Sequence, residues 1–175
     1  MIAVVALAAI GGASALRASG GPANPEAVNL GTGMWDIATR IDQLDIPGLP
    51  PAMVQKMAKD PANAKPRSVC IAASADTPPP VSVFHTLNGA CRYETWQADR
   101  GRLRAVLACS PPDGGAGEAR VEISGGYTAS TFAVTSETIA RDDTGETQLR
   151  MRSTISGTLM SAGADCSAAG QSPQG

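Results

Sequence analysis

The alternation of apolar and polar side chains between Cys91 and Cys166 constrains the fold of this chain more than any other feature. Successive side chains of a β-strand point to opposite faces, so a strand with one buried face shows a period of two. That period recurs in segments separated by Gly, Pro or Asp residues: RYETWQA, GRLRAVLAC, EARVEI, GYTASTFAVTSETIA and ETQLRMRSTISG. The pattern predicts an all-β fold, an antiparallel meander that forms a curved sheet or a small barrel.

Turn-forming residues cluster at the breaks between these segments. Ser124-Gly125-Gly126 is short enough to predict a tight hairpin at that point. Asp143-Thr144-Gly145 matches the tripeptide of aspartic proteases, but that site needs apolar flanks and a second copy. Because Asp142 and Glu146 flank the tripeptide, a hairpin turn is the better interpretation.

Two shorter strands are expected before the meander. The first covers Leu30 to Ile41 and places Trp35, Ile37 and Thr39 on one face. The second covers Arg67 to Ala72. Both are expected to pack with the meander in one domain.

One short helix is expected after the first strand. Pro51 suits the first position of a helix over Ala52 to Lys59, because proline there forfeits no hydrogen bond. Met53, Val54 and Met57 are expected on one side of it. Two interpretations stay open: a cover over one end of the sheet, or a methionine-lined gate over an apolar cavity.

The ends of the chain predict export. Residues 1–15 resemble the apolar region and cleavage site of a secretory signal, with Ala13-Ser14-Ala15 as the small-residue motif. We expect 16–28 to be a flexible linker, 29–166 a disulfide-linked β domain, and 167–175 a disordered tail. A periplasmic or secreted location follows, with no membrane span after cleavage; a buried apolar strand or helix is the alternative for the first segment.

Four cysteines fit an exported chain, in which disulfides persist. Three pairings are open, and we expect Cys70–Cys91 and Cys109–Cys166 because each links neighbouring segments. A zinc site is the rival interpretation, but there is no C-x-x-C spacing and only one histidine, His85. We therefore expect neither a metal nor another cofactor.

Charge and composition exclude some partners. A net charge of −2 gives no electrostatic case for nucleic acid. Aromatic residues make up only 3% of the chain, so its core must be largely aliphatic. The expected state is a monomer without an enzymatic site; a hydrolase using His85 is a minor alternative, because no Gly-x-Ser-x-Gly motif accompanies it.

Several short motifs occur in a distinctive order: Gly33-Met34-Trp35-Asp36, Pro47-Gly48-Leu49-Pro50, Gly89-Ala90-Cys91, and the cysteines at 70, 109 and 166. Together they resemble a family of small secreted bacterial proteins catalogued as domain of unknown function 3617. Its members have an export signal, a Gly-x-Trp-Glu strand, a Pro/Met-rich segment and spaced cysteines; Asp36 stands here where glutamate is usual. The resemblance covers Leu30 to Cys166 and implies compartment and architecture, but no reaction.

A second likeness is to lipocalin-like barrels, in which a Gly-x-Trp motif opens the first strand and an arginine of the last strand packs over the tryptophan. By this likeness the sheet would close into a small lipocalin-like barrel, and Trp35 would meet Arg150 or Arg152. Such barrels hold apolar ligands.

The leading functional hypothesis is therefore a non-enzymatic envelope domain that binds a small apolar molecule or lipid fragment. The alternative is a solid-cored protein that acts through protein–protein contacts. The predicted lining of a ligand site combines aliphatic, methionine and tryptophan side chains: Trp35, Met53, Met57, Leu103, Leu107, Val121 and Met151.

Overall fold

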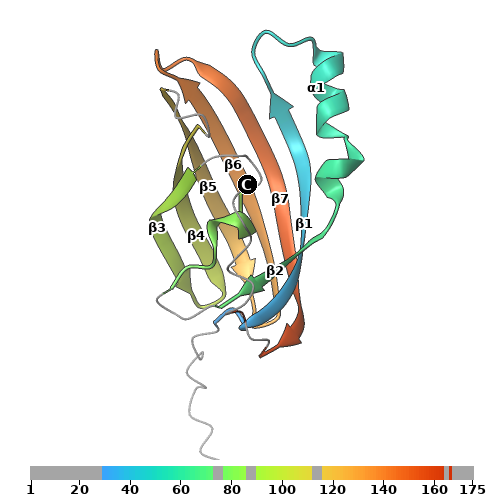
Figure 1. Cartoon of the computed structure of the whole chain (residues 1–175), viewed down its shortest axis with the longest axis vertical. Helices are drawn as coiled ribbons and strands as arrows, with labels where there is room; N and C mark the ends of the chain where they lie inside the picture. The colour runs from blue at the N-terminus through green and yellow to red at the C-terminus, as the bar shows by residue number, and fades with distance from the viewer. Residues whose placement is uncertain (1–28, 73–76, 86–89, 112–115, 164–165, 167–175) are drawn as a thin grey trace, which may run out of the picture.

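The described part of the chain is a curled antiparallel sheet with one short α-helix beside it (Figure 1). The structure is a computed structural model and describes residues 29–72, 77–85, 90–111, 116–163 and 166. The elements are β1 (Gly33–Asp45), α1 (Pro51–Ala58), η1 (Pro61–Ala64), β2 (Arg67–Ile71), η2 (Val81–Val83), β3 (Ala90–Asp99), β4 (Arg102–Ser110), β5 (Gly117–Tyr127), β6 (Thr131–Asp142) and β7 (Thr147–Ala162).

The predicted meander is confirmed. The seven described strands follow the order β2-β1-β7-β6-β5-β4-β3. Each strand from β3 to β6 therefore pairs with the next strand in sequence, and β7 also pairs with β1. The sheet is a half-barrel, and β2 and β3 are its two edge strands. The predicted signal (1–15), linker (16–28) and tail (167–175) lie outside the described residues. Within the described residues, no helix is long and apolar enough to cross a membrane.

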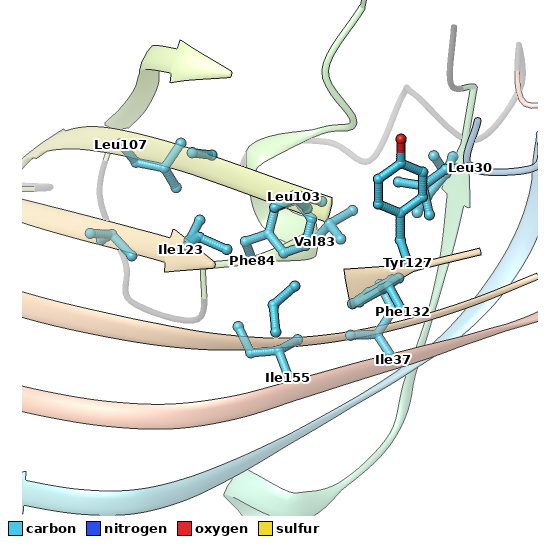
Figure 2. Packing of buried hydrophobic residues seen from close by; sticks show 14 of the residues in the cluster. Leu30, Ile37, Val83, Phe84, Leu103, Leu107, Ile123, Tyr127, Phe132 and Ile155 are labelled. Carbon is cyan, nitrogen blue, oxygen red and sulfur yellow. The ribbon is translucent and has the colours of Figure 1, made fainter. Parts of the chain in front are cut away.

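The core covers the inner face of the half-barrel. Trp35 and Ile37 of β1 are fully buried, as the alternation predicts, and they join one continuous cluster with Leu103, Phe132 and Ile155. Figure 2 shows Ile37, Leu103, Phe132 and Ile155 gathered from several strands. The Trp35 indole packs on the Phe132 ring at 5.6 Å between centroids. The few aromatic side chains are thus concentrated at one place in an otherwise aliphatic core.

A segment between β2 and β3 covers part of this inner face. It carries η2 and Phe84, whose ring is 1% exposed and lies 5.6 Å from the Phe132 ring. Arg67 of β2 anchors it, because the guanidinium donates hydrogen bonds to the carbonyls of Ser82 (2.7 Å) and Val83 (2.9 Å). The η2 segment therefore acts as a plug held from the edge of the sheet.

The expected contact of Trp35 with an arginine of the last strand is wrong. Trp35 lies opposite Leu159 of β7, whereas Arg150 and Arg152 lie opposite Asp45 and Gln43 at the far end of β1. Alternation also places both arginines on the outer face of the sheet. The indole Nε1 instead donates to the Gly31 carbonyl at 2.9 Å.

The predicted hairpin at Gly125-Gly126 is also wrong, because β5 continues through both glycines to Tyr127. The turn lies four residues later, where the Thr128 N–H donates to the Thr131 carbonyl at 2.7 Å. The Thr128 hydroxyl accepts from the Ser130 and Thr131 N–H groups and so closes the turn.

The short helix forms where predicted, but its methionines face away from the sheet. Only Val54 is buried, whereas Met53 and Met57 are 51% and 44% exposed. Residues four apart share one helix face, and the residue at position 54 is turned by about 100° from position 53. Because α1 contacts β1 through the Val54 side, Met53 and Met57 point to solvent.

The disulfides pair Cys70 with Cys166 and Cys91 with Cys109, so the expected pairing is wrong. Cys91 and Cys109 face each other across β3 and β4. The other two lie on either side of the start of β1, because β2 and β7 are the neighbours of β1. One bond thus joins paired residues of two consecutive strands, and the other crosses the start of β1.

Candidate functional site

A row of small side chains crosses the inner face at one end of the sheet. Cys91 of β3 lies opposite Cys109 of β4, which lies opposite Ala119 of β5, which lies opposite Ala140 of β6. The neighbouring row is built from the larger Tyr93, Leu107, Val121 and Thr138. The small row therefore leaves space beside the larger row.

A hollow of about 260 Å³ lies at this end of the sheet, and its surface is mainly apolar. Glu118 of β5 and Arg141 of β6 lie opposite each other in the sheet and are the charged residues at its rim. The Arg141 guanidinium also donates to the Gly145 carbonyl at 3.1 Å, which ties it to the β6–β7 turn. The lining residues are His85, Cys109, Ser110, Pro111, Glu118, Ala119, Ala140 and Arg141.

His85 is the one group with acid–base chemistry near neutral pH in this lining. Its side chain is half-buried, directly after Phe84 in the η2 segment. Burial lowers the pKa of the imidazole below its ordinary value of 6.5, and the positive charge of Arg67 lowers it further. His85 is therefore neutral at pH 7 and able to accept a proton or a metal ion through a ring nitrogen.

The imidazole of His85 lies beside the inner-face disulfide. A ring nitrogen of His85 and the sulfur atoms of Cys91 and Cys109 all lie within 4.8 Å of one another. In the disulfide the two sulfurs are bonded to each other and present no thiolate to a metal. Ser110 and Glu118 also border the hollow, but alternation directs both side chains to the outer face. The hydrolase alternative therefore gains no support from this geometry.

The predicted lining residues do not surround one cavity. Trp35, Leu103, Leu107 and Val121 are at most 1% exposed and belong to the packed core. Met53 and Met57 face solvent on α1. Met151 is half-buried and borders a separate groove of about 380 Å³, beside Gln43–Asp45 and Glu137–Ile139.

Two further hollows are more polar. One of about 450 Å³ runs over the outer face from Gln97 to Arg152 and is bordered by two acidic and two basic side chains. Another of about 330 Å³ lies between β1 and α1 and is lined by residues of both, including Leu44 and Val54. The hollow beside His85 differs from both in its small apolar floor.

Asp143-Thr144-Gly145 is the turn between β6 and β7, as predicted. The Asp142 carboxylate accepts hydrogen bonds from the Thr144 N–H (3.0 Å), the Thr144 hydroxyl (2.7 Å) and the Glu146 N–H (2.9 Å). These bonds lower the pKa of Asp142, the Thr144 hydroxyl most strongly. The aspartate therefore shapes a turn.

Sequence reasoning did not single out the residues that form the hollow. Alanines such as Ala119 and Ala140 carry no chemical signal, and only the strand register brings them into one row with Cys109. The only signal in the sequence was the alternation, which puts both alanines on the apolar face of their segments. That the two alanines lie in one row with Cys109 follows only from the register of three paired strands.

Fold and hollow define a class of protein: a disulfide-linked half-barrel domain with a small apolar recess at one end of its sheet. A family model described as "Protein of unknown function (DUF3617)" matches residues 28–166, and the chain belongs to this family. No curated protein and no solved structure matches the chain. The two disulfides favour an oxidising, extracytoplasmic compartment.

Proposed function

We propose that this protein is a periplasmic or secreted binding domain that holds a small, mainly apolar molecule in the hollow beside His85. The proposal retains the ligand class expected from the sequence and moves the site to the end of the sheet. The observation that carries it is the recess of about 260 Å³ floored by Cys109, Ala119 and Ala140, beside the packed core of the sheet.

The size and charge of the recess restrict the ligand. Sites for drug-sized molecules measure roughly 300–1,000 Å³, so this recess suits a single ring or a short acyl segment. Arg141 and Glu118 border the recess with their side chains on the outer face of the sheet, so they can meet only the end of a ligand that extends past the apolar floor. Because their charges are opposite, together they favour neither an anionic nor a cationic end. An apolar body with a short polar end fits these features best.

Fluorescent apolar probes test the proposal on the oxidised protein. The neutral probe N-phenyl-1-naphthylamine and the anionic probe 1-anilinonaphthalene-8-sulfonate should both gain fluorescence on binding. Ala140→Phe should abolish the gain, because the added ring fills the recess. Ala133→Phe is the matched control, since Ala133 is exposed on the opposite face of the same strand. Ala119→Leu provides a smaller obstruction if Ala140→Phe does not fold.

Equal probe binding by folded Ala140→Phe, Ala119→Leu and wild-type protein would reject the site. A selective loss of the anionic probe in Arg141→Gln would identify the rim arginine as the anion contact. Thermal unfolding of each variant serves as the folding control.

The exposed apolar side chains near α1 support a second candidate, a protein that acts through protein–protein contacts. Leu49, Met53 and Met57 are 37%, 51% and 44% exposed and lie within nine residues of one another. A photo-crosslinking residue at position 57 should give one specific adduct in the cell envelope. The same residue at exposed Lys65 is the control, and identical adducts at both positions would reject this candidate.

A further inference from the structure

We propose that reduction of the Cys91–Cys109 disulfide converts this corner of the sheet into a binding site for a thiophilic metal ion, with His85, Cys91 and Cys109 as its protein ligands. The inference goes beyond apolar ligand binding, because it concerns the reduced protein and a different ligand class. It rests on the meeting of three soft or borderline donor atoms within 4.8 Å of one another.

The three ligands come from two parts of the fold that are held in place independently: the β3–β4 ladder and the η2 segment. Cys91 and Cys109 are held opposite each other by the β3–β4 ladder, which extends from Ala90↔Ser110 to Asp99↔Arg102. Because backbone hydrogen bonds maintain that ladder, cleavage of the S–S bond leaves the two sulfurs adjacent.

His85 is positioned independently of the disulfide. Phe84, its neighbour in sequence, is anchored in the core with its ring 6.1 Å from the Trp96 ring. Arg67 fixes the preceding carbonyls of Ser82 and Val83. The imidazole therefore remains beside the sulfurs when they are reduced, so that the site is preorganised.

A dithiol can supply the two electrons and two protons that reduction of the Cys91–Cys109 disulfide requires. A dithiol donates two electrons and two protons to the Cys91–Cys109 bond, becomes a disulfide itself, and leaves two thiols. A divalent ion such as Zn²⁺ then displaces both thiol protons and binds two thiolates, while a ring nitrogen of His85 supplies the third ligand. Two sulfurs and one nitrogen are a ligand set that zinc accepts, with a fourth position open toward the hollow.

The cluster is distinctive within the described residues. No other group of three or more His, Cys, Asp or Glu side chains there brings its ligand atoms this close together. The Cys70–Cys166 bond is remote in the sheet, joining β2 to the segment after β7. On reduction its two thiols have no third His, Asp or Glu ligand close by within the described residues.

Cadmium and zinc titrations test the inference. The wild-type protein, oxidised or reduced with a phosphine, is titrated with Cd²⁺, and the thiolate-to-cadmium charge-transfer absorption is recorded. A chelator competition then gives the Zn²⁺ affinity. We expect one ion per reduced chain, no binding by the oxidised chain, and an affinity at least about tenfold lower in reduced His85→Gln.

Two comparisons assign the ligands. Cys70→Ser/Cys166→Ser should retain the absorption on reduction, whereas Cys91→Ser/Cys109→Ser should lose it. Ser82→Ala, exposed in the same segment as His85, should bind as the wild type does. His85→Gln keeps all four cysteines, so it remains informative if either cysteine variant does not fold.

Absence of metal binding by the reduced wild type, or equal affinity in reduced wild type and His85→Gln, would overturn the inference. Because apolar probes are tested on the oxidised protein and metal ions on the reduced protein, failure of one result leaves the other standing.

Discussion

Phe132 of β6 lies directly opposite Gly157 of β7, and its ring occupies the space where a side chain at position 157 would stand. A Cβ atom on Gly157 would lie 2.2 Å from Cε1 of Phe132. The bare backbone lets the ring sink onto β7 and meet Trp35 and Phe84, each at 5.6 Å between centroids. The aromatic centre of the core therefore depends on a missing side chain.

Gly157→Ala should lower the free energy of unfolding by about 1–3 kcal/mol, because the buried ring must move within a packed core. Urea unfolding measures the effect. Phe132→Leu in the same chain should relieve part of the clash, so the two changes should cost less together than their separate costs added. Strict additivity would show that the two residues do not interact.

The two glycines of β5 should respond differently to alanine. At Gly125 a Cβ atom would lie 2.2 Å from the Ala133 carbonyl oxygen, whereas at Gly126 the closest atom is the Gly101 oxygen at 3.6 Å. Gly125→Ala should cost about 1–3 kcal/mol or more. Gly126→Ala should be neutral or stabilise by up to about 1 kcal/mol, because alanine restricts the unfolded chain. Equal losses in urea unfolding would contradict the β5–β6 register.

The two disulfides should contribute unequally to stability. Cys70–Cys166 spans 96 residues and Cys91–Cys109 spans 18. Loop-closure entropy predicts a contribution of about 4.7 kcal/mol for the longer loop and about 3 kcal/mol for the shorter one. Cys70→Ser/Cys166→Ser should therefore lower the unfolding midpoint in urea more than Cys91→Ser/Cys109→Ser. The reverse order would mean that the β3–β4 bond stabilises the native sheet directly.

The pKa of His85 should make the oxidised protein less stable as the pH falls below about 6.5. The unfolded histidine binds a proton near that pH, while burial and Arg67 hold the folded pKa lower. The contribution of His85 to the free energy of unfolding is complete above the pKa that the residue has in the unfolded chain. It is lost as the pH falls toward the lower pKa of the folded protein. Thermal unfolding against pH should show this slope in wild type and a reduced slope in His85→Gln.

Arg67→Gln provides the matching electrostatic control. Removal of the positive charge should raise the pKa of His85 toward 6.5. Because the chain has one histidine, a single imidazole resonance reports the change in an NMR titration. An unchanged pKa would indicate that burial alone is responsible. Asp42 and Asp142 lose their contributions to folding stability in a more acidic pH range, because the pKa of each carboxyl group lies below its ordinary value of 3.8.

Much of the fold was predictable from alternation alone. The predicted faces of Trp35, Ile37 and Thr39 are confirmed, and four of the five segments of the meander each form one strand. The fifth, GYTASTFAVTSETIA, contains the end of β5, the β5–β6 turn and most of β6. One apolar side chain in two is a strong signal wherever a sheet has one buried face. Turn positions were less predictable, because a glycine can indicate a turn or a close contact with a neighbouring backbone. Gly125 makes such a close contact, with the backbone of β6.

The disulfide pairing and the hollow required a register that the sequence does not state. Counting back from the Asp99↔Arg102 pair, an unbroken ladder would place Cys91 opposite Ser110. The irregularity between Tyr93 and Thr95 shifts the pairing by one residue and brings Cys91 opposite Cys109. A β-bulge of this kind depends on packing against neighbouring strands, so local propensity does not reveal it.

The Cys70–Cys166 bond also has a mechanical consequence. Tension applied to the chain ahead of β1 and beyond Cys166 crosses from Cys166 to Cys70 through the S–S bond. The load then passes along β2, α1 and β1, and the chain between the two cysteines, from η2 through β7, bears none of it. The Cys70–Cys166 disulfide thus protects most of the sheet, including the recess beside His85, from forces that pull on the ends of the domain.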